Sequence, residues 1–123
     1  MDRDTFPDDL RKFILTRIPS VPYLESLILL RNDPSIAWDP KSLARRVYVS
    51  EKKAEELLSE LQKAGFVNVV ETNMYRFEQS SKELSAMCDR LADVYSTNIV
   101  GVTNLIHSTA SKPAQHFADA FKW

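Results

Sequence analysis

The chain has 123 residues, enough for one domain with a modest core and too few for two independent ones. Hydrophobic residues make up 44% and charged residues 27%, which is ordinary for a globular protein. Only two glycines and six prolines are present, so long flexible linkers are excluded and we expect mostly helix. Near the N-terminus the longest apolar run is Leu27 to Leu30, far shorter than the roughly 20 residues of a membrane span.

The sequence contains few motifs of the kind that exported proteins, enzymes or metal-binding proteins need. The start, MDRDTFPDDL, lacks the basic and apolar regions of a signal peptide, and Cys88 is the only cysteine, so we expect a cytoplasmic protein. There is no glycine-rich phosphate loop, nucleophile elbow or obvious carboxylate pair. His107 and His116 have no carboxylate or thiol at ligand spacing. We therefore expect no enzyme, no metal site and no cofactor.

Two helices are predicted at the start of the chain. Leu10, Phe13, Ile14 and Ile18 recur at helical spacing and predict a helix over about residues 7–18. A second helix, PYLESLILLRN, follows over 22–32, and its dense leucines predict that it lies at the centre of the core. Residues 32–39 are expected to form a turn region.

The next segment carries the clearest signals. Asp39 followed by Pro40 predicts the start of a short helix over 40–47, and Ser50 predicts the cap of a longer helix, EKKAEELLSELQKAG. The following FVNVVETNMYRF predicts two strands around a Thr72-Asn73 turn. Two helices joined by a short turn and followed by a hairpin predict a winged helix-turn-helix, an arrangement that presents one helix to a groove and the hairpin beside it.

The C-terminal part predicts a long helix over about 81–107. Its apolar residues recur every three or four positions, and a helix of that length cannot bury its whole stripe on so small a core. We therefore expect a dimer seam; its residues are Leu84, Leu91, Asn98, Val102 and Leu105. Asn98 is either a polar residue that fixes the register of this seam or an exposed asparagine. A last short helix is expected from Ser111, with aromatic residues at 117, 121 and 123.

The segment SLARRVYVSEKKAEELLSELQKAGFV, residues 42–67, resembles the winged-helix bacterial transcriptional regulators of the MarR and PadR kind. The likeness rests on Leu43-Ala44, Val49-Ser50, the leucines of the longer helix, and Ala64-Gly65-Phe66-Val67. In that family the long terminal helices pair two subunits, so that two recognition helices meet successive major grooves about 34 Å apart. The resemblance implies a homodimer bound to double-stranded DNA.

The resemblance also assigns residues to the DNA contact. They lie on the recognition helix and on the wing: Ser50, Lys52, Lys53, Glu55, Glu56, Asn73 and Arg76. Glu55 and Glu56 depart from the family, whose members commonly carry Arg, Ser, Thr or Gln there. The outer surface from Glu51 to Glu60 is thus either a base-reading face, since glutamate can accept from cytosine, or a solvated face of a structural helix. Arg45 and Arg46 either hold phosphates or pair with surface glutamates.

The predicted helix-turn-helix segment is more basic than the rest of the chain, as DNA binding would favour. The whole chain has a net charge of -1, but residues 41–65 hold six basic and four acidic groups while both flanks are acidic overall. We therefore predict one mainly helical winged-helix domain over 1–123, with a core at 7–79 and a dimerisation region at 80–123. The predicted function is a homodimeric DNA-binding transcriptional regulator. The alternative is a protein-protein interaction module on the same fold, without DNA binding.

Overall fold

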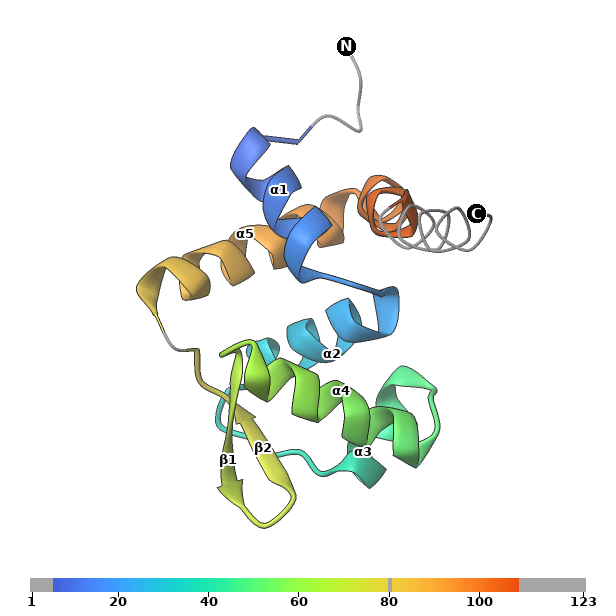
Figure 1. Ribbon diagram of the computed structural model, residues 1–123, viewed down its shortest axis with the longest axis vertical. Coiled ribbons are helices and arrows are strands. Elements are labelled where there is room, and N and C mark those ends of the chain that lie inside the picture. The colour runs from blue at the N-terminus through green and yellow to red at the C-terminus, as the bar shows by residue number, and fades with distance from the viewer. Residues whose placement is uncertain (1–5, 80, 109–123) are drawn as a thin grey trace, which may run out of the picture. The chain divides into compact units, whose positions relative to one another are not determined.

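Helices dominate the computed structural model, which describes residues 6–79 and 81–108 (Figure 1). The elements in chain order are α1 (Asp8–Arg17), α2 (Val21–Asn32), α3 (Pro40–Val47), α4 (Glu51–Lys63), β1 (Val67–Glu71), β2 (Met74–Phe77) and α5 (Lys82–Thr97). A further helix follows over Ile99–Ser108. The predicted class, mainly helical with a small antiparallel sheet of two strands, is confirmed.

The chain forms two compact units. One comprises residues 22–89, with nearly all of α2, then α3, α4, the hairpin and the first half of α5; the other comprises α1 and the residues from Arg90 onward. The predicted organisation differs: it places the first helix in a core at residues 7–79 and starts the second region at residue 80. The structure instead groups α1 with the C-terminal helices and divides α5 between the two units.

The starts of α3 and α4 are fixed by side-chain caps at the predicted residues. The Asp39 carboxylate accepts a hydrogen bond from the Ser42 N–H at 2.8 Å, and the Ser42 hydroxyl accepts from the Asp39 N–H at 3.2 Å. The Ser50 hydroxyl accepts from the Lys53 N–H at 3.0 Å. These bonds satisfy N–H groups that no carbonyl of the helix can reach, which is why the helices begin there.

The core of the unit 22–89 is built from the inner faces of its helices. Ala54, Leu57, Leu58 and Leu61 of α4 are fully buried, as their spacing predicted, and Leu43 of α3 is buried as well. Each buried leucine contributes roughly 1.5–3 kcal/mol relative to exposure. The aromatic ring of Phe66 follows α4 and meets the ring of Tyr23 edge-on, with centroids 6.4 Å apart. This packing holds the base of the hairpin against α2.

The hairpin has the predicted turn and one strand partner that was not predicted. Thr72 and Asn73 connect β1 to β2, and Asn73 has φ 64°, a left-handed conformation that asparagine tolerates. On its other edge β2 pairs with Trp38, whose N–H donates to the Tyr75 carbonyl at 2.7 Å and whose carbonyl accepts from the Tyr75 N–H at 2.8 Å. The region expected to be only a turn therefore supplies a short extended segment that pairs with the hairpin.

The second unit is held by an apolar interior and an ion pair. Leu10, Phe13 and Ile14 of α1 are buried. Arg90 donates to both carboxylate oxygens of Asp9, at 2.6 and 2.9 Å. The hydrogen bond from Arg90 lowers the pKa of Asp9 to about 2. This bidentate geometry links α1 to α5 within the unit.

The predicted single helix over 81–107 is wrong, because the chain breaks at Asn98. Helix α5 ends at Thr97, and the next helix begins at Ile99. The side-chain oxygen of Asn98 accepts from the Gly101 N–H at 3.0 Å, so Asn98 caps the second helix. The hydroxyls of Ser96 and Thr97 donate back to the Asp93 carbonyl, at 2.7 and 3.3 Å. Such bonds compete with helical ones and favour a helix end.

The residues assigned to the dimer seam do not form an exposed stripe. Leu91 and Val102 are 0% exposed and Leu105 is 7% exposed within a single chain. Leu84 is partly buried, and Asn98 serves as the cap. The premise that this apolar stripe exceeds what the chain can bury is therefore contradicted, since the two shorter helices turn these side chains inward. The short helix expected from Ser111 lies outside the described residues.

None of the described helices is by itself long and apolar enough to cross a membrane.

Candidate nucleic-acid interface

Helix α4 exposes a face that carries both signs of charge. With 100° between successive residues, Lys52, Glu56 and Lys63 lie within about 40° of each other, opposite the buried Ala54 and Leu61. Glu55 flanks this face, and all four charged side chains are exposed. The structure thus confirms that Lys52, Glu55 and Glu56 are available to solvent.

The start of α4 is the most basic part of this surface. Lys52 and Lys53 lie in the first turn and are exposed, and Ser50 is exposed at the cap. The Ser50 oxygen already accepts from the Lys53 N–H, but its O–H remains available as a donor. These three predicted residues therefore lie together at one end of the helix. In that position each could contact an anionic ligand.

The residues predicted for the wing lie on a hairpin that projects from the helices (Figure 1). Asn73 is exposed in its turn, and Arg76 is partly exposed on β2, directly across from Asn68. The register places Asn68 and Arg76 on one face of the hairpin and Val69 with Tyr75 on the other. Arg76 therefore points away from the aromatic face, as predicted. Its guanidinium remains accessible to a ligand.

The two arginines of α3 have different surroundings. The charge of Arg45 acts on the nearby Asp39 carboxylate and helps to lower its pKa, after the hydrogen bonds from Ser42. Ion pairs join Arg31 to Asp89 and Arg90 to Asp9, on elements other than α3 and α4. No ion pair within residues 6–79 and 81–108 involves Arg45 or Arg46, so the predicted alternative of surface pairing with glutamate is not realised there. Arg46 instead places its guanidinium over the Trp38 ring, 5.5 Å from the centroid. The exposed Lys52 and Lys53 at the start of α4 are the basic side chains there that an anion could approach.

Tyr48 is a surface feature that the sequence analysis missed. It follows α3 with φ 60° and ψ 49°, in the left-handed region, and its side chain is 92% exposed. Glycine or asparagine usually occupies this position at a helix end. A tyrosine there gives no sequence signal of a left-handed residue. Its exposure follows from the backbone turn and not from any hydrophobic pattern.

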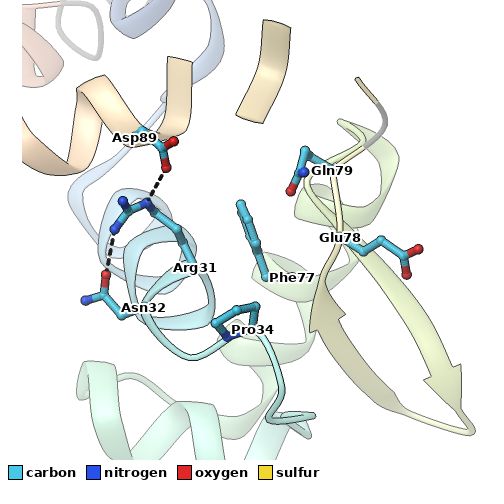
Figure 2. Close-up of a pocket in the computed structure, with 7 residues that line it drawn as sticks. All are labelled: Arg31, Asn32, Pro34, Phe77, Glu78, Gln79 and Asp89. Atoms are coloured by element: carbon cyan, nitrogen blue, oxygen red, sulfur yellow. Dashed lines mark hydrogen bonds and ion pairs between the residues drawn. The ribbon is translucent and has the colours of Figure 1, made fainter. Parts of the chain in front are cut away.

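A second surface feature is an open pocket of about 580 Å³ between the end of α2, the end of β2 and α5 (Figure 2). Figure 2 shows the Phe77 ring between Arg31 and Gln79. Arg31 donates to Asp89 at 3.0 Å and to Asn32 at 2.9 Å, so its charge is already engaged within the pocket. Among the described residues that line the pocket, the acidic side chains are Glu78 and Asp89.

The described part of the chain does not assemble a metal centre. Within residues 6–79 and 81–108, no three His, Cys, Asp or Glu side chains are grouped so that they could share a metal ion. Comparisons with protein-family models, with curated proteins and with solved structures found no match.

Proposed function

We propose that the protein is a winged-helix transcriptional regulator that binds double-stranded DNA as a homodimer. The observation that carries the proposal is the order of elements in the unit 22–89. Helix α2, the short extended segment at Trp38, helix α3, helix α4 and the hairpin follow one another as in a winged helix. In this proposal α4 is the recognition helix and the hairpin is the wing.

The exposed polar residues support a DNA ligand. Phosphate contacts come mostly from Lys, Arg, Ser and backbone donors, and Lys52, Lys53 and Ser50 provide such groups at the start of α4. Arg76 and Asn73 add two more on the hairpin. Glu55 and Glu56 are the side chains that could accept from a cytosine amino group. The net charge of -1 predicts modest non-specific affinity, and the dependence of binding on salt scales with the number of phosphates contacted.

A salt titration tests the DNA-binding proposal. The probe is a set of duplex fragments from the promoter region of the protein's own gene, followed by fluorescence anisotropy. We expect the logarithm of the binding constant to fall linearly with the logarithm of the salt concentration. The slope should be near -0.9 for each phosphate contacted. Lys53→Ala should lower this slope by about one contact, whereas Lys12→Ala on α1, an equal change of charge, should not. Affinity weaker than about 10⁻⁴ M at physiological salt would contradict DNA binding.

The homodimer needs a surface other than the buried leucines of the expected seam. Ile99 and Val100, at the start of the last described helix, are 54% and 68% exposed. Such a pair is a candidate contact with a second copy, because exposed apolar side chains favour association. Light scattering on a sizing column should give twice the 14.1 kDa chain mass. Ile99→Lys with Val100→Lys should then give the monomer mass, and a wild-type monomer at micromolar concentration would exclude the dimer.

The alternative function is a protein-interaction module on the same fold. Val69 and Val70 on β1 are 39% and 36% exposed, an apolar feature that a phosphate backbone does not need. In this alternative the hairpin binds another protein. Copurification from the native host distinguishes the two functions, since a stoichiometric protein partner without enriched DNA supports the module.

A further inference from the structure

The pocket of Figure 2 lies within the unit 22–89, since all seven described residues that line it belong to that unit. The ends of α2 and β2 and the helix α5 supply its walls. Its volume of about 580 Å³ falls in the range of roughly 300–1,000 Å³ that small-molecule sites occupy. The pocket therefore has room for a ligand built around an aromatic ring.

The Phe77 ring provides a flat apolar wall of this pocket and is half-buried. Within residues 6–79 and 81–108 it pairs with no second aromatic ring and with no cation. The face of an aromatic ring attracts a cation through its quadrupole. Phe77 thus offers a surface that favours a planar ligand and tolerates positive charge on it.

The pocket also holds two acceptor oxygens that lack a protein donor. The Gln79 side-chain oxygen is buried and accepts no hydrogen bond from the described part of the chain. The Asp89 carboxylate accepts from Arg31 through Oδ1, and no described residue donates to its Oδ2. The terminal torsion of glutamine is broad, so the amide can turn its oxygen into the pocket with little strain. A ligand that carries N–H donors would satisfy both groups.

The charges of the pocket favour a cation over an anion. Among the described lining residues one arginine stands against two carboxylates, so their net charge is -1. The Arg31 guanidinium is engaged by Asp89 at 3.0 Å, which weakens its effect on another charge. Figure 2 shows the Glu78 carboxylate directed away from the Phe77 ring, and Glu78 accepts from Asn68 at 3.3 Å. Asp89 is therefore the carboxylate placed to pair with a bound cation.

We propose that this pocket binds a small planar organic cation, an aromatic ring that bears an amidinium or ammonium group. In this arrangement the ligand lies against Phe77, and its charged N–H groups donate to Asp89 Oδ2 and to the side-chain oxygen of Gln79. The ion pair with Arg31 holds the Asp89 carboxylate in place. The inference does not rest on DNA binding, because no described lining residue belongs to the proposed DNA contact.

Benzamidine, benzamide and benzoate are matched probes, because they share one ring and are positive, neutral and negative. Each is titrated into the full nitrogen-15-labelled chain at fixed salt, and the amide chemical shifts report both affinity and location. We expect benzamidine to shift the resonances of Phe77, Gln79 and Asp89 and to bind with a dissociation constant below about 5 mM. Its affinity should exceed that of the other two probes at least about tenfold. Weaker binding, equal affinities, or shifts confined to other residues would overturn the proposal.

Two substitutions test the charge and the ring. Asp89→Asn should lower the affinity for benzamidine about tenfold, because the charged hydrogen bond is lost. Glu60→Gln on α4 removes an equal charge outside the lining residues and should leave the affinity unchanged. Phe77→Leu keeps an apolar side chain but removes the ring, and the affinity should fall about fivefold. Affinities unchanged in both pocket variants, with melting curves that show folded protein, would place the cation elsewhere.

Gln79→Leu separates ligand binding from folding. An apolar side chain of similar size replaces a buried acceptor that has no donor, so the melting temperature should stay the same or rise. The affinity for benzamidine should nevertheless fall several-fold, since the ligand loses an acceptor. A purely structural Gln79 would show neither effect on binding nor the opposite signs of the two changes. An affinity equal to that of the wild type would remove Gln79 from the site.

The outcomes are distinguishable from those of the DNA titration, because benzamidine binding is measured without DNA. A chain that binds benzamidine at Phe77 and Asp89 but no duplex would contradict only the proposed function. A chain that binds duplex and no benzamidine would contradict only the inference drawn from the pocket.

Discussion

Residues 39–78 and residues 81–108 differ in how directly their sequence encodes their structure. In the first region every helix, strand and turn lies where the sequence predicted it, because each boundary carries its own signal. Asp39 and Ser50 cap helices, and Asn73 occupies a left-handed turn. In the second region one long helix was predicted and two were found. The helix limits were predicted correctly where a residue at the boundary carries its own signal, and incorrectly where only apolar periodicity was used.

The error in the second region has a specific cause. Leu84, Leu91, Asn98 and Leu105 are seven residues apart, and such a repeat looks continuous whether or not the helix is. Asn98 fits the repeat as a polar seam residue and also fits a cap. The structure shows the cap, supported by the back-bonded hydroxyls of Ser96 and Thr97. Three consecutive residues that compete for backbone hydrogen bonds were the signal that the periodicity concealed.

The largest expected effect tests whether Leu91 belongs to a core or to a dimer seam. Leu91→Ala should reduce the free energy of unfolding by about 2–5 kcal/mol, because the side chain is 0% exposed within one chain. Leu58→Ala in the first region, equally buried, is the matched control and should cost a similar amount. Urea unfolding measures both. If the difference in unfolding free energy between wild type and Leu91→Ala disappeared at low protein concentration, Leu91 would instead act through a contact between two chains.

The next effect concerns the cap that defines the first region. Asp39→Ala should cost about 1 kcal/mol, since the N–H of Ser42 loses its acceptor. In the folded state the pKa of Asp39 is lowered from its usual 3.8, mainly by the hydrogen bond from the Ser42 N–H and secondly by the Ser42 hydroxyl. The charged cap therefore stabilises the fold above pH 3.8, and that contribution is lost as pH falls through the lowered folded-state pKa.

The free energy of unfolding, measured across this pH range, tests the direction of this pH dependence. The stability difference between wild type and Asp39→Ala should shrink as acid protonates the carboxylate. Asp39→Asn keeps an acceptor without a charge, so its stability relative to Asp39→Ala should be insensitive to pH over the same range. A difference that grows in acid would contradict the assignment of the cap.

The candidate interface could be predicted only in part. Ser50, Lys52 and Lys53 are exposed as helical spacing required, since the inward stripe of α4 is unambiguous. The exposed, left-handed conformation of Tyr48 could not be predicted, because it arises from how α3 is joined to α4. Tyrosine is not a residue type that signals a left-handed backbone. The extended segment at Trp38 also escaped prediction, since a single bridge is too short to show an alternating pattern.

A smaller effect tests the break in the second region. Asn98→Ala should cost about 1 kcal/mol by removing the acceptor of the Gly101 N–H, whereas Asn98→Ser should retain most of the stability. Thermal unfolding followed by circular dichroism measures both. If Asn98→Ala were as stable as the wild type and gained helical signal, the two helices would be better described as one that is only locally bent.

The smallest expected effect comes from Gly101→Ala, where two contributions nearly cancel. Alanine favours a helix over glycine by up to about 1 kcal/mol. However, a Cβ at this position would approach the Cγ and Oδ1 of Asn98 to 2.8 Å, so the cap would have to move and its roughly 1 kcal/mol would be reduced. We therefore expect a net change near zero in the wild-type background. In the Asn98→Ala background the obstruction is gone, and the same substitution should stabilise by about 0.5–1 kcal/mol. Equal effects in both backgrounds would mean that Gly101 does not make room for the cap that divides this region.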